Sequence, residues 1–323
     1  MERRRLGGTA VDVTRLILGC GNFGGIGSAP EFFGQGETQA EAERLMDAAW
    51  DAGIRCFDTA DAYGGGRSEQ WIGEWLRARG VHGDVVLETK VFHSVAGDAR
   101  DHGLSPARVR RQIEGSLARL GVERVDLYLI HEPDPETPVA DTLEVLDELV
   151  RAGSVGAIGA SNVDGDYLAE ALRISGERGL ARFEWVQNSY SLLDRASERD
   201  VLPLCREHGL GFTPFGPLAG GWLTGKYRRG EPKPAGSRMT QRPDSYVRYD
   251  DERVYTALDE LVRVAAQRGL ESATLAFAWL LSNPDVTAVV VGPRRPEHLR
   301  PALDALEIEL AEDDRAALAA LFN

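Results

Sequence analysis

Two patterns of hydrophobic and polar residues alternate along the chain. Short apolar runs rich in β-branched residues are each followed by a longer segment with apolar residues at three- and four-residue spacing. The short runs predict buried strands, and the longer segments predict amphipathic helices. We expect eight strands, at 16–20, 55–59, 85–90, 125–131, 156–161, 185–189, 211–215 and 286–292. We expect helices at 38–52, 68–79, 106–120, 138–152, 165–178, 197–208 and 296–304.

This order predicts parallel β-α units, and eight such units without a linker predict a closed barrel. The expected fold is α/β, a single (β/α)8 TIM barrel forming one domain over residues 1–323. Two parts depart from the repeat: residues 3–14 predict a β-hairpin around Gly7-Gly8, and two additional helices are expected at 251–268 and 272–282. The alternative is an open doubly wound sheet, but the glycines of Gly19-Cys-Gly-Asn-Phe-Gly-Gly lack the G-x-G-x-x-G spacing.

Local signals mark where several helices begin and end. Ser105-Pro106 and Thr137-Pro138 each place a hydroxyl residue before a proline, which predicts a capped helix start. Glycines that follow the helical patterns predict helix ends at Gly53, Gly80, Gly121 and Gly153.

Composition and charge exclude several classes of function. The chain has 37 basic and 51 acidic residues, and its net charge of −14 disfavours binding to nucleic acid or to an anionic membrane. Its longest apolar run, 274–281, is far too short to span a bilayer. The three cysteines form no C-x-x-C pair, which argues against a disulfide scaffold and a zinc ribbon. Without an apolar signal region at the N-terminus, a cytoplasmic location is expected.

Four polar side chains follow or end three neighbouring predicted strands: Asp58, Tyr63, Lys90 and His131. Each alone is an ordinary turn or rim residue, but together they form a workable acid for carbonyl reduction. A phenol has a pKa of about 10, and lowering it to about 7 takes roughly 4 kcal/mol. We expect the Lys90 ammonium to supply much of that shift, with Asp58 orienting Lys90. His131 would either hydrogen-bond the carbonyl oxygen or relay a proton. The hydride must come from a cofactor, because no side chain can donate one.

These residues lie within motifs that resemble those of the aldo-keto reductases. The motifs are Phe57-Asp-Thr-Ala-Asp-Ala-Tyr-Gly64, Thr89-Lys90, His131-Glu-Pro-Asp134, Gly159-Ala-Ser-Asn162, Gln187-Asn-Ser-Tyr190 and Pro217-Leu-Ala-Gly-Gly-Trp-Leu-Thr-Gly-Lys-Tyr227. They occur in order and cover essentially the whole chain. The resemblance implies a TIM barrel that uses NADPH to reduce an aldehyde or ketone. It also implies that Asp58, Tyr63, Lys90 and His131 are catalytic, with Tyr63 as the general acid.

The resemblance further implies a cofactor site. Ser161, Asn162 and Gln187 would bind the nicotinamide carboxamide, and Phe215 would stack on the nicotinamide ring. Arg294 and Arg295, after the last strand, would receive the adenosine 2′-phosphate and favour NADPH over NADH. The full set of expected cofactor contacts is Asn22, Asp58, Ser161, Asn162, Gln187, Phe215, Gly216, Leu218, Gly220, Lys226, Arg238, Gly292, Arg294, Arg295 and His298.

The chain departs from the family pattern at two places in this site. Gly216 stands where a serine is usual, and His298, Pro301 and Ala302 stand where a glutamine and a Glu-Asn pair commonly hold the adenine. The adenine-binding residues are therefore the part of the cofactor site in which this chain differs most from the family pattern.

Aromatic loop residues predict a pocket for a small, partly apolar carbonyl compound. They are Phe23, Phe32, Phe33, Phe92, His93, Trp222 and Tyr246. The sequence leaves the natural substrate and the oligomeric state open.

Two other functions compete with the reductase. One is a redox-sensing regulatory subunit with slow turnover, like the potassium-channel β-subunits of the same superfamily. The other is a metal-dependent hydrolase built on Asp58, His131 and Asp134, which would need further histidine partners. We expect no metal site, no nucleic-acid partner and no membrane partner.

Overall fold

A computed structural model describes residues 1–98 and 100–323 of the chain. Eight parallel strands form one sheet in the order β10-β3-β4-β5-β6-β7-β8-β9. Their bounds are β3 Leu16–Gly19, β4 Cys56–Asp58, β5 Val86–Val91, β6 Val125–Ile130, β7 Val155–Ser161, β8 Phe183–Gln187, β9 Gly211–Phe212 and β10 Val289–Val291.

The sheet closes on itself between β9 and β10. The backbone N–H of Thr287 donates to the carbonyl oxygen of Phe212 at 2.9 Å, and that of Val290 donates to Pro214 at 2.9 Å. The predicted (β/α)8 barrel is therefore confirmed, and the open doubly wound sheet is wrong. The expected strand at 211–215 is shorter in the structure: β9 ends at Phe212, and beyond it the pairing continues through single backbone hydrogen bonds and an isolated bridge between Ser189 and Phe215.

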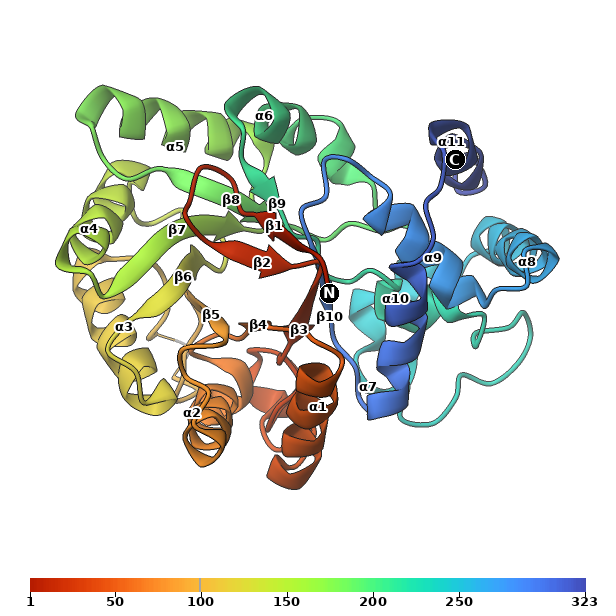
Figure 1. Ribbon diagram of the computed structural model, residues 1–323, viewed down its shortest axis with the longest axis horizontal. Coiled ribbons are helices and arrows are strands. Elements are labelled where there is room, and N and C mark those ends of the chain that lie inside the picture. The colour runs from red at the N-terminus through yellow and green to blue at the C-terminus, as the bar shows by residue number, and fades with distance from the viewer. Residues whose placement is uncertain (99) are drawn as a thin grey trace.

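Helices surround the barrel in the order expected (Figure 1). Those between the strands are α1 Gln39–Asp51, α2 Arg67–Arg79, α3 Pro106–Leu120, α4 Val139–Ala152, α5 Gly165–Arg178, α6 Val201–His208 and the short α7 Arg238–Gln241. The two additional helices are α8 Glu252–Gln267 and α9 Ser272–Leu281, and every residue of α9 is buried. The predicted helix at 296–304 divides into a 3-10 turn, Pro296–Leu299, and α10 Arg300–Ala305, and α11 Glu312–Ala320 ends the chain.

The helix ends agree with the sequence better than the helix starts do. Gly80, Gly121 and Gly153 all take the left-handed conformation directly after their helices, as predicted. Ser105 is the N-cap residue of α3 and Pro106 its first helical residue, as predicted, but the Ser105 side chain makes no capping hydrogen bond. The cap predicted at Thr137 is wrong, because α4 begins only after Pro138. The Thr137 hydroxyl instead donates to Asp134 at 2.7 Å, within the loop that follows β6.

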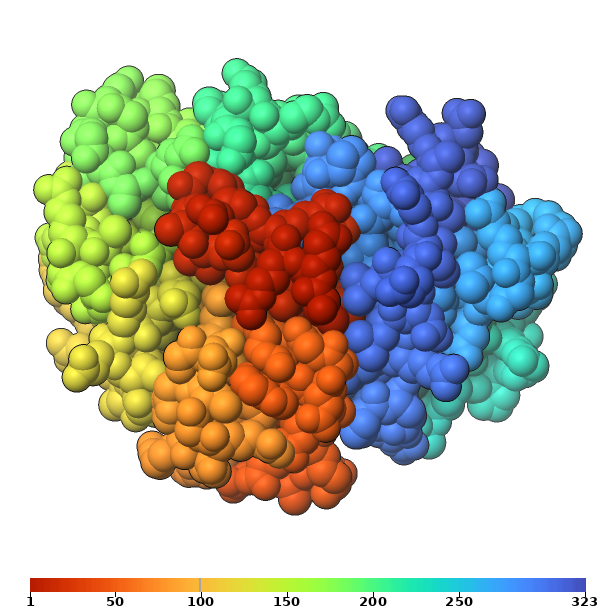
Figure 2. All heavy atoms as spheres, in the orientation of Figure 1, coloured from red at the N-terminus to blue at the C-terminus, as the bar shows by residue number. Residues whose placement is uncertain are grey.

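The predicted N-terminal hairpin closes the amino end of the barrel. Its strands are β1 Arg3–Arg5 and β2 Asp12–Thr14, and they run across the barrel in Figure 1. Leu6 is fully buried among residues of the barrel interior, including Leu127 and Trp185. Gly7 has φ +54°, and a Cβ there would lie 2.0 Å from the carbonyl oxygen of Glu184, so only glycine fits. Figure 2 shows atoms of the hairpin covering the middle of this face.

Among the helices that the structure describes, none combines the length and the apolar composition needed to cross a membrane.

Candidate active site

The four expected catalytic residues lie together at the carboxyl ends of three adjacent strands. Asp58 ends β4, Lys90 is the fifth residue of β5, and His131 directly follows β6. Tyr63 begins a 3-10 turn, Tyr63–Gly66, just before α2. The Lys90 side chain is 1% exposed and that of Asp58 is 5% exposed.

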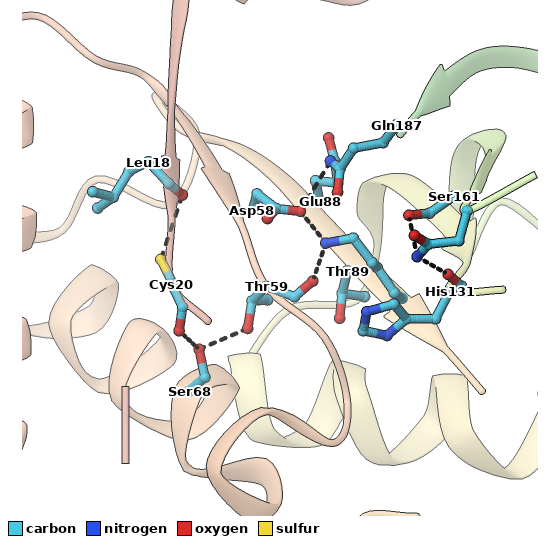
Figure 3. A network of polar contacts seen from close by, with 12 residues as sticks. Leu18, Cys20, Asp58, Thr59, Ser68, Glu88, Thr89, His131, Ser161 and Gln187 are labelled. Atoms are coloured by element: carbon cyan, nitrogen blue, oxygen red, sulfur yellow. Dashed lines mark hydrogen bonds and ion pairs between the residues drawn. The ribbon is translucent and has the colours of Figure 1, made fainter. Parts of the chain in front are cut away.

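A buried ion pair joins Lys90 to Asp58. The Lys90 ammonium donates to Asp58 and, at 3.0 Å, to the carbonyl oxygen of Thr59 (Figure 3). It also lies 5.3 Å from the centre of the Tyr63 ring. Burial acts to lower the pKa of Lys90, but the Asp58 charge, supported by Tyr63 and Glu88, raises it above its ordinary value. Lys90 is therefore a permanent cation beside the phenol at neutral pH.

The phenol itself differs from the expectation. Burial raises the pKa of Tyr63 to about 12, and this outweighs the opposing effect of Lys90. The expected lowering of this pKa toward neutrality is thus wrong for the chain alone. The consequence is that Tyr63 holds its proton throughout the neutral range, as a proton donor must before it reacts.

Two histidine rings pack edge-to-face next to the phenol, His131 against Tyr63 and His93 against His131. The ring centroids of Tyr63 and His131 are 5.5 Å apart, and those of His93 and His131 are 4.7 Å apart. Burial lowers the pKa of His131 well below its ordinary value and that of His93 to about 4. Both imidazoles are consequently neutral near pH 7, and His131 is available to a substrate as a hydrogen-bond donor or acceptor.

The pKa of His93 leads to a prediction about acid stability. The unfolded chain takes up a proton at His93 below about pH 6.5, whereas the folded chain resists protonation until about pH 4. Stability should therefore decrease as the pH falls from 6.5 toward 4, and His93→Gln should lose less of it. Melting temperature measured against pH tests this, with His208→Gln, at an exposed position, as control. Equal pH dependence in wild type and His93→Gln would contradict the prediction.

The residues expected at the nicotinamide end lie on the next two strands. Ser161 ends β7 and Gln187 ends β8. The Asn162 amide donates to the carbonyl oxygen of His131 at 2.8 Å and to the Ser161 hydroxyl at 3.2 Å. The Gln187 amide donates to Asp58 at 3.3 Å, so this group is continuous with the Lys90 pair. Phe215 lies three residues after the end of β9 and is half-buried. An isolated bridge pairs it with Ser189, two residues after Gln187.

The sequence reasoning missed Glu88. This side chain is fully buried and accepts a hydrogen bond from the Gln187 amide (Figure 3). Burial, followed by the nearby Asp58 charge, raises its pKa well above the ordinary value. A usable signal exists in the sequence, because Glu88 and Lys90 are two apart on one strand and so face the same side.

At the other end of the expected cofactor site, three basic residues come together from distant segments. Arg238 donates to the side-chain oxygen of Asn22 at 2.5 Å, and Arg294 pairs with Glu37 at 3.0 Å. Burial, then the charges of Arg238 and Arg294, lowers the pKa of Lys226. These three cations are thus close enough for the charges of the two arginines to affect the pKa of Lys226.

The two arginines after the last strand do not act as a pair. Arg294 points to Glu37, and its backbone N–H donates to the His298 ring at 3.4 Å. Arg295 is exposed and lies 3.9 Å from Glu297. Between β10 and these arginines, Gly292 is exposed. The expected joint grip on a phosphate would therefore need Arg295 to reorient.

The loop after β9 contains the remaining expected contacts, Gly216, Leu218 and Gly220. The backbone of Gly220 has φ +67°, and a Cβ there would lie 2.5 Å from the Tyr246 ring, so glycine lets that ring pack on the loop. Trp222 does not line a pocket as expected. It is fully buried, with its ring 4.7 Å from that of Tyr227.

Over residues 1–98 and 100–323, no group of three or more His, Cys, Asp or Glu side chains is arranged to hold a metal ion. All three cysteines are buried and free.

Comparison with known proteins identifies the family. A sequence model described as "Aldo/keto reductase family" matches residues 15–323. The uncharacterized oxidoreductase YrpG of Bacillus subtilis (strain 168) is 37% identical, over 97% of this chain and 93% of its own. The NADH-specific methylglyoxal reductase of Escherichia coli (strain K12) is 33% identical, over 97% and 96%. A probable voltage-gated potassium channel subunit beta of Oryza sativa subsp. japonica is 32% identical, over 95% and 92%. The chain belongs to the aldo/keto reductase family.

Proposed function

We propose that this protein reduces an aldehyde or ketone to an alcohol, with Tyr63 as general acid and NADPH as the reductant. The observation that carries the proposal is the buried Lys90–Asp58 ion pair beside a protonated phenol and a neutral His131. The relatives support an oxidoreductase, since two of those named above are an oxidoreductase and a methylglyoxal reductase.

The residues of the chain divide the chemistry among them. Tyr63 and His131 hydrogen-bond the carbonyl oxygen and orient the substrate. As negative charge develops on that oxygen, the Tyr63 hydroxyl gives up its proton to it. The Lys90 ammonium stabilises the resulting phenolate, and Asp58 holds Lys90 in place. A bound reduced nicotinamide would supply the hydride.

The residues present fit a nicotinamide dinucleotide. Ser161, Asn162 and Gln187 offer a hydroxyl and two amides, which match the donors and acceptor of a carboxamide. At the other end, one guanidinium nitrogen of Arg238 is buried without a hydrogen-bond partner among the described residues. Together with Lys226 and Arg294, Arg238 forms a cationic region suited to phosphate groups.

The decisive experiment is a panel of aldehydes and ketones tested with purified protein, following oxidation of NADPH and of NADH by absorbance. We expect at least one small aldehyde to be reduced, with NADPH as the better cofactor. Failure to oxidise either cofactor with any carbonyl compound would refute the reductase, and a clear preference for NADH would refute the choice of NADPH.

A second function is favoured by the rice relative, which is named as a potassium channel subunit beta. A redox-sensing regulatory subunit would keep the barrel and the cofactor but turn over slowly. Single-turnover and steady-state rates separate the two functions. A sensor binds cofactor tightly and reduces aldehydes very slowly, whereas a reductase turns over at typical enzyme rates of about 1 to 10³ per second.

Chelation provides a further test. In the proposed chemistry no step needs a Lewis acid, because Tyr63 supplies the proton and Lys90 stabilises the negative charge. Activity should therefore survive EDTA unchanged. Loss of activity on chelation, with recovery on adding a divalent ion, would instead support the hydrolase-type reading.

A further inference from the structure

An acidic residue, Glu37, lies within the cationic end of the proposed cofactor site. It directly precedes Thr38, the N-cap residue of α1, and its side chain is 4% exposed. The backbone fixes its position, because its N–H donates to the carbonyl oxygen of Asn22 at 2.8 Å and its own carbonyl accepts from Gly24 at 3.0 Å. Glu37 is thus tied to the loop that also holds Arg238 through Asn22.

One oxygen of Glu37 is used and the other is free. Oε1 accepts from Arg294 Nε at 3.0 Å, whereas Oε2 is buried with no hydrogen-bond partner among the described residues. Arg294 is held further by the carbonyl oxygen of Gly236, at 2.6 Å. Burying a carboxylate oxygen without a hydrogen-bond partner costs folding free energy. A ligand that donates a hydrogen bond to Oε2 would offset this cost.

This arrangement treats the two nicotinamide dinucleotides differently. The 2′-phosphate of NADPH must compete with Glu37 for Arg294 and is repelled by the carboxylate. The 2′-hydroxyl of NADH meets no such repulsion and can donate to a carboxylate oxygen, a contact that many dinucleotide-binding proteins use. Lys226 and Arg238 attract phosphate groups of both cofactors, so the discrimination falls on Glu37 and Arg294.

We propose that Glu37 is a specificity-determining residue: by neutralising Arg294 and repelling a 2′-phosphate, it limits the preference of this site for NADPH over NADH. This inference rests on the proposed function, because it requires that a nicotinamide dinucleotide binds here.

The test compares Glu37→Gln with wild type in the binding of two inert ligands, ADP-ribose and its 2′-phosphate, by calorimetry. Neither ligand carries a nicotinamide, so no turnover complicates the measurement. We expect the variant to favour the phosphorylated ligand more than wild type does, by on the order of tenfold in the ratio of dissociation constants, or about 1.4 kcal/mol. An unchanged ratio would overturn the role of Glu37.

Two further variants sharpen the test. Glu43→Gln removes a charge from an exposed position of α1, the helix that follows Glu37, and should leave the ratio unchanged; an equal gain would mean that net charge alone is responsible. Arg294→Gln alone and combined with Glu37→Gln complete a double-mutant cycle. If Glu37→Gln fails to fold, the double variant should still bind the phosphorylated ligand more tightly than Arg294→Gln does. Equal binding by those two would contradict the repulsion.

The failure of this inference can be told from failure of the proposed function. If wild type binds ADP-ribose and its 2′-phosphate but Glu37→Gln leaves their ratio unmoved, only the role of Glu37 is wrong. If wild type binds neither ligand and neither intact cofactor, the proposed cofactor site itself is wrong.

Discussion

Replacing Tyr63 with phenylalanine is expected to reduce carbonyl reduction by about 10²- to 10⁴-fold, the usual contribution of a general acid. The substitution removes only the phenolic oxygen, so the ring contact with His131 remains. Cofactor affinity should stay within about twofold of wild type, because none of the proposed carboxamide or phosphate contacts is altered. Steady-state kinetics with the best aldehyde, together with cofactor titration by fluorescence, measure both quantities.

Tyr128→Phe is the matched control. Tyr128 is also fully buried, and its hydroxyl has no hydrogen-bond partner among the residues described. The control should therefore retain activity and stability close to those of wild type. If Tyr63→Phe keeps most of the wild-type rate, Tyr63 is not the acid.

The second large effect is expected for Lys90→Met. Removing one partner of a buried ion pair leaves Asp58 uncompensated, which typically costs about 3–5 kcal/mol of unfolding free energy. Loss of the cation also withdraws the group that stabilises the phenolate. Activity should fall by about 10²-fold or more. Denaturant unfolding and aldehyde kinetics measure the two losses separately.

A double variant, Asp58→Asn with Lys90→Met, separates stability from catalysis. It removes both charges of the pair, so it should recover part of the lost stability without recovering activity. Recovery of activity together with stability would mean that Lys90 acts only by holding the structure. An unchanged pH–rate profile in a well-folded Lys90→Met protein would lead to the same conclusion.

The barrel could be predicted from the sequence because its signal repeats. Each strand and helix has its own periodicity, and the positions of Asp58, Lys90 and His131 follow from strand ends that all lie at one edge. The helix starts are harder to predict from the sequence. A hydroxyl group before a proline can either cap the helix or hydrogen-bond another side chain. Thr137 shows this, since it donates to Asp134 instead of capping a helix.

What the sequence could not supply is the balance between burial and charge. The proximity of Lys90 to Tyr63 was expected, but only the three-dimensional packing shows that burial dominates and raises the pKa of the phenol. Arg294 and Arg295 are adjacent in the chain yet have different partners, 257 residues and two residues away in sequence. In the sequence Glu37 resembles an ordinary surface acid, and only the tertiary contacts show that it is buried.

The N-terminal hairpin closes the amino end of the barrel and leaves the carboxyl end for ligands. Leu6 and its apolar neighbours, among them Cys56, seal the amino end beneath Asp58 and Glu88. Because this cluster is apolar, we expect protons to pass between these carboxyl groups and bulk water through the opposite end of the barrel. A ligand bound at that end would block this path. The protonation states of Asp58 and Glu88 should then stay fixed for as long as the ligand is bound.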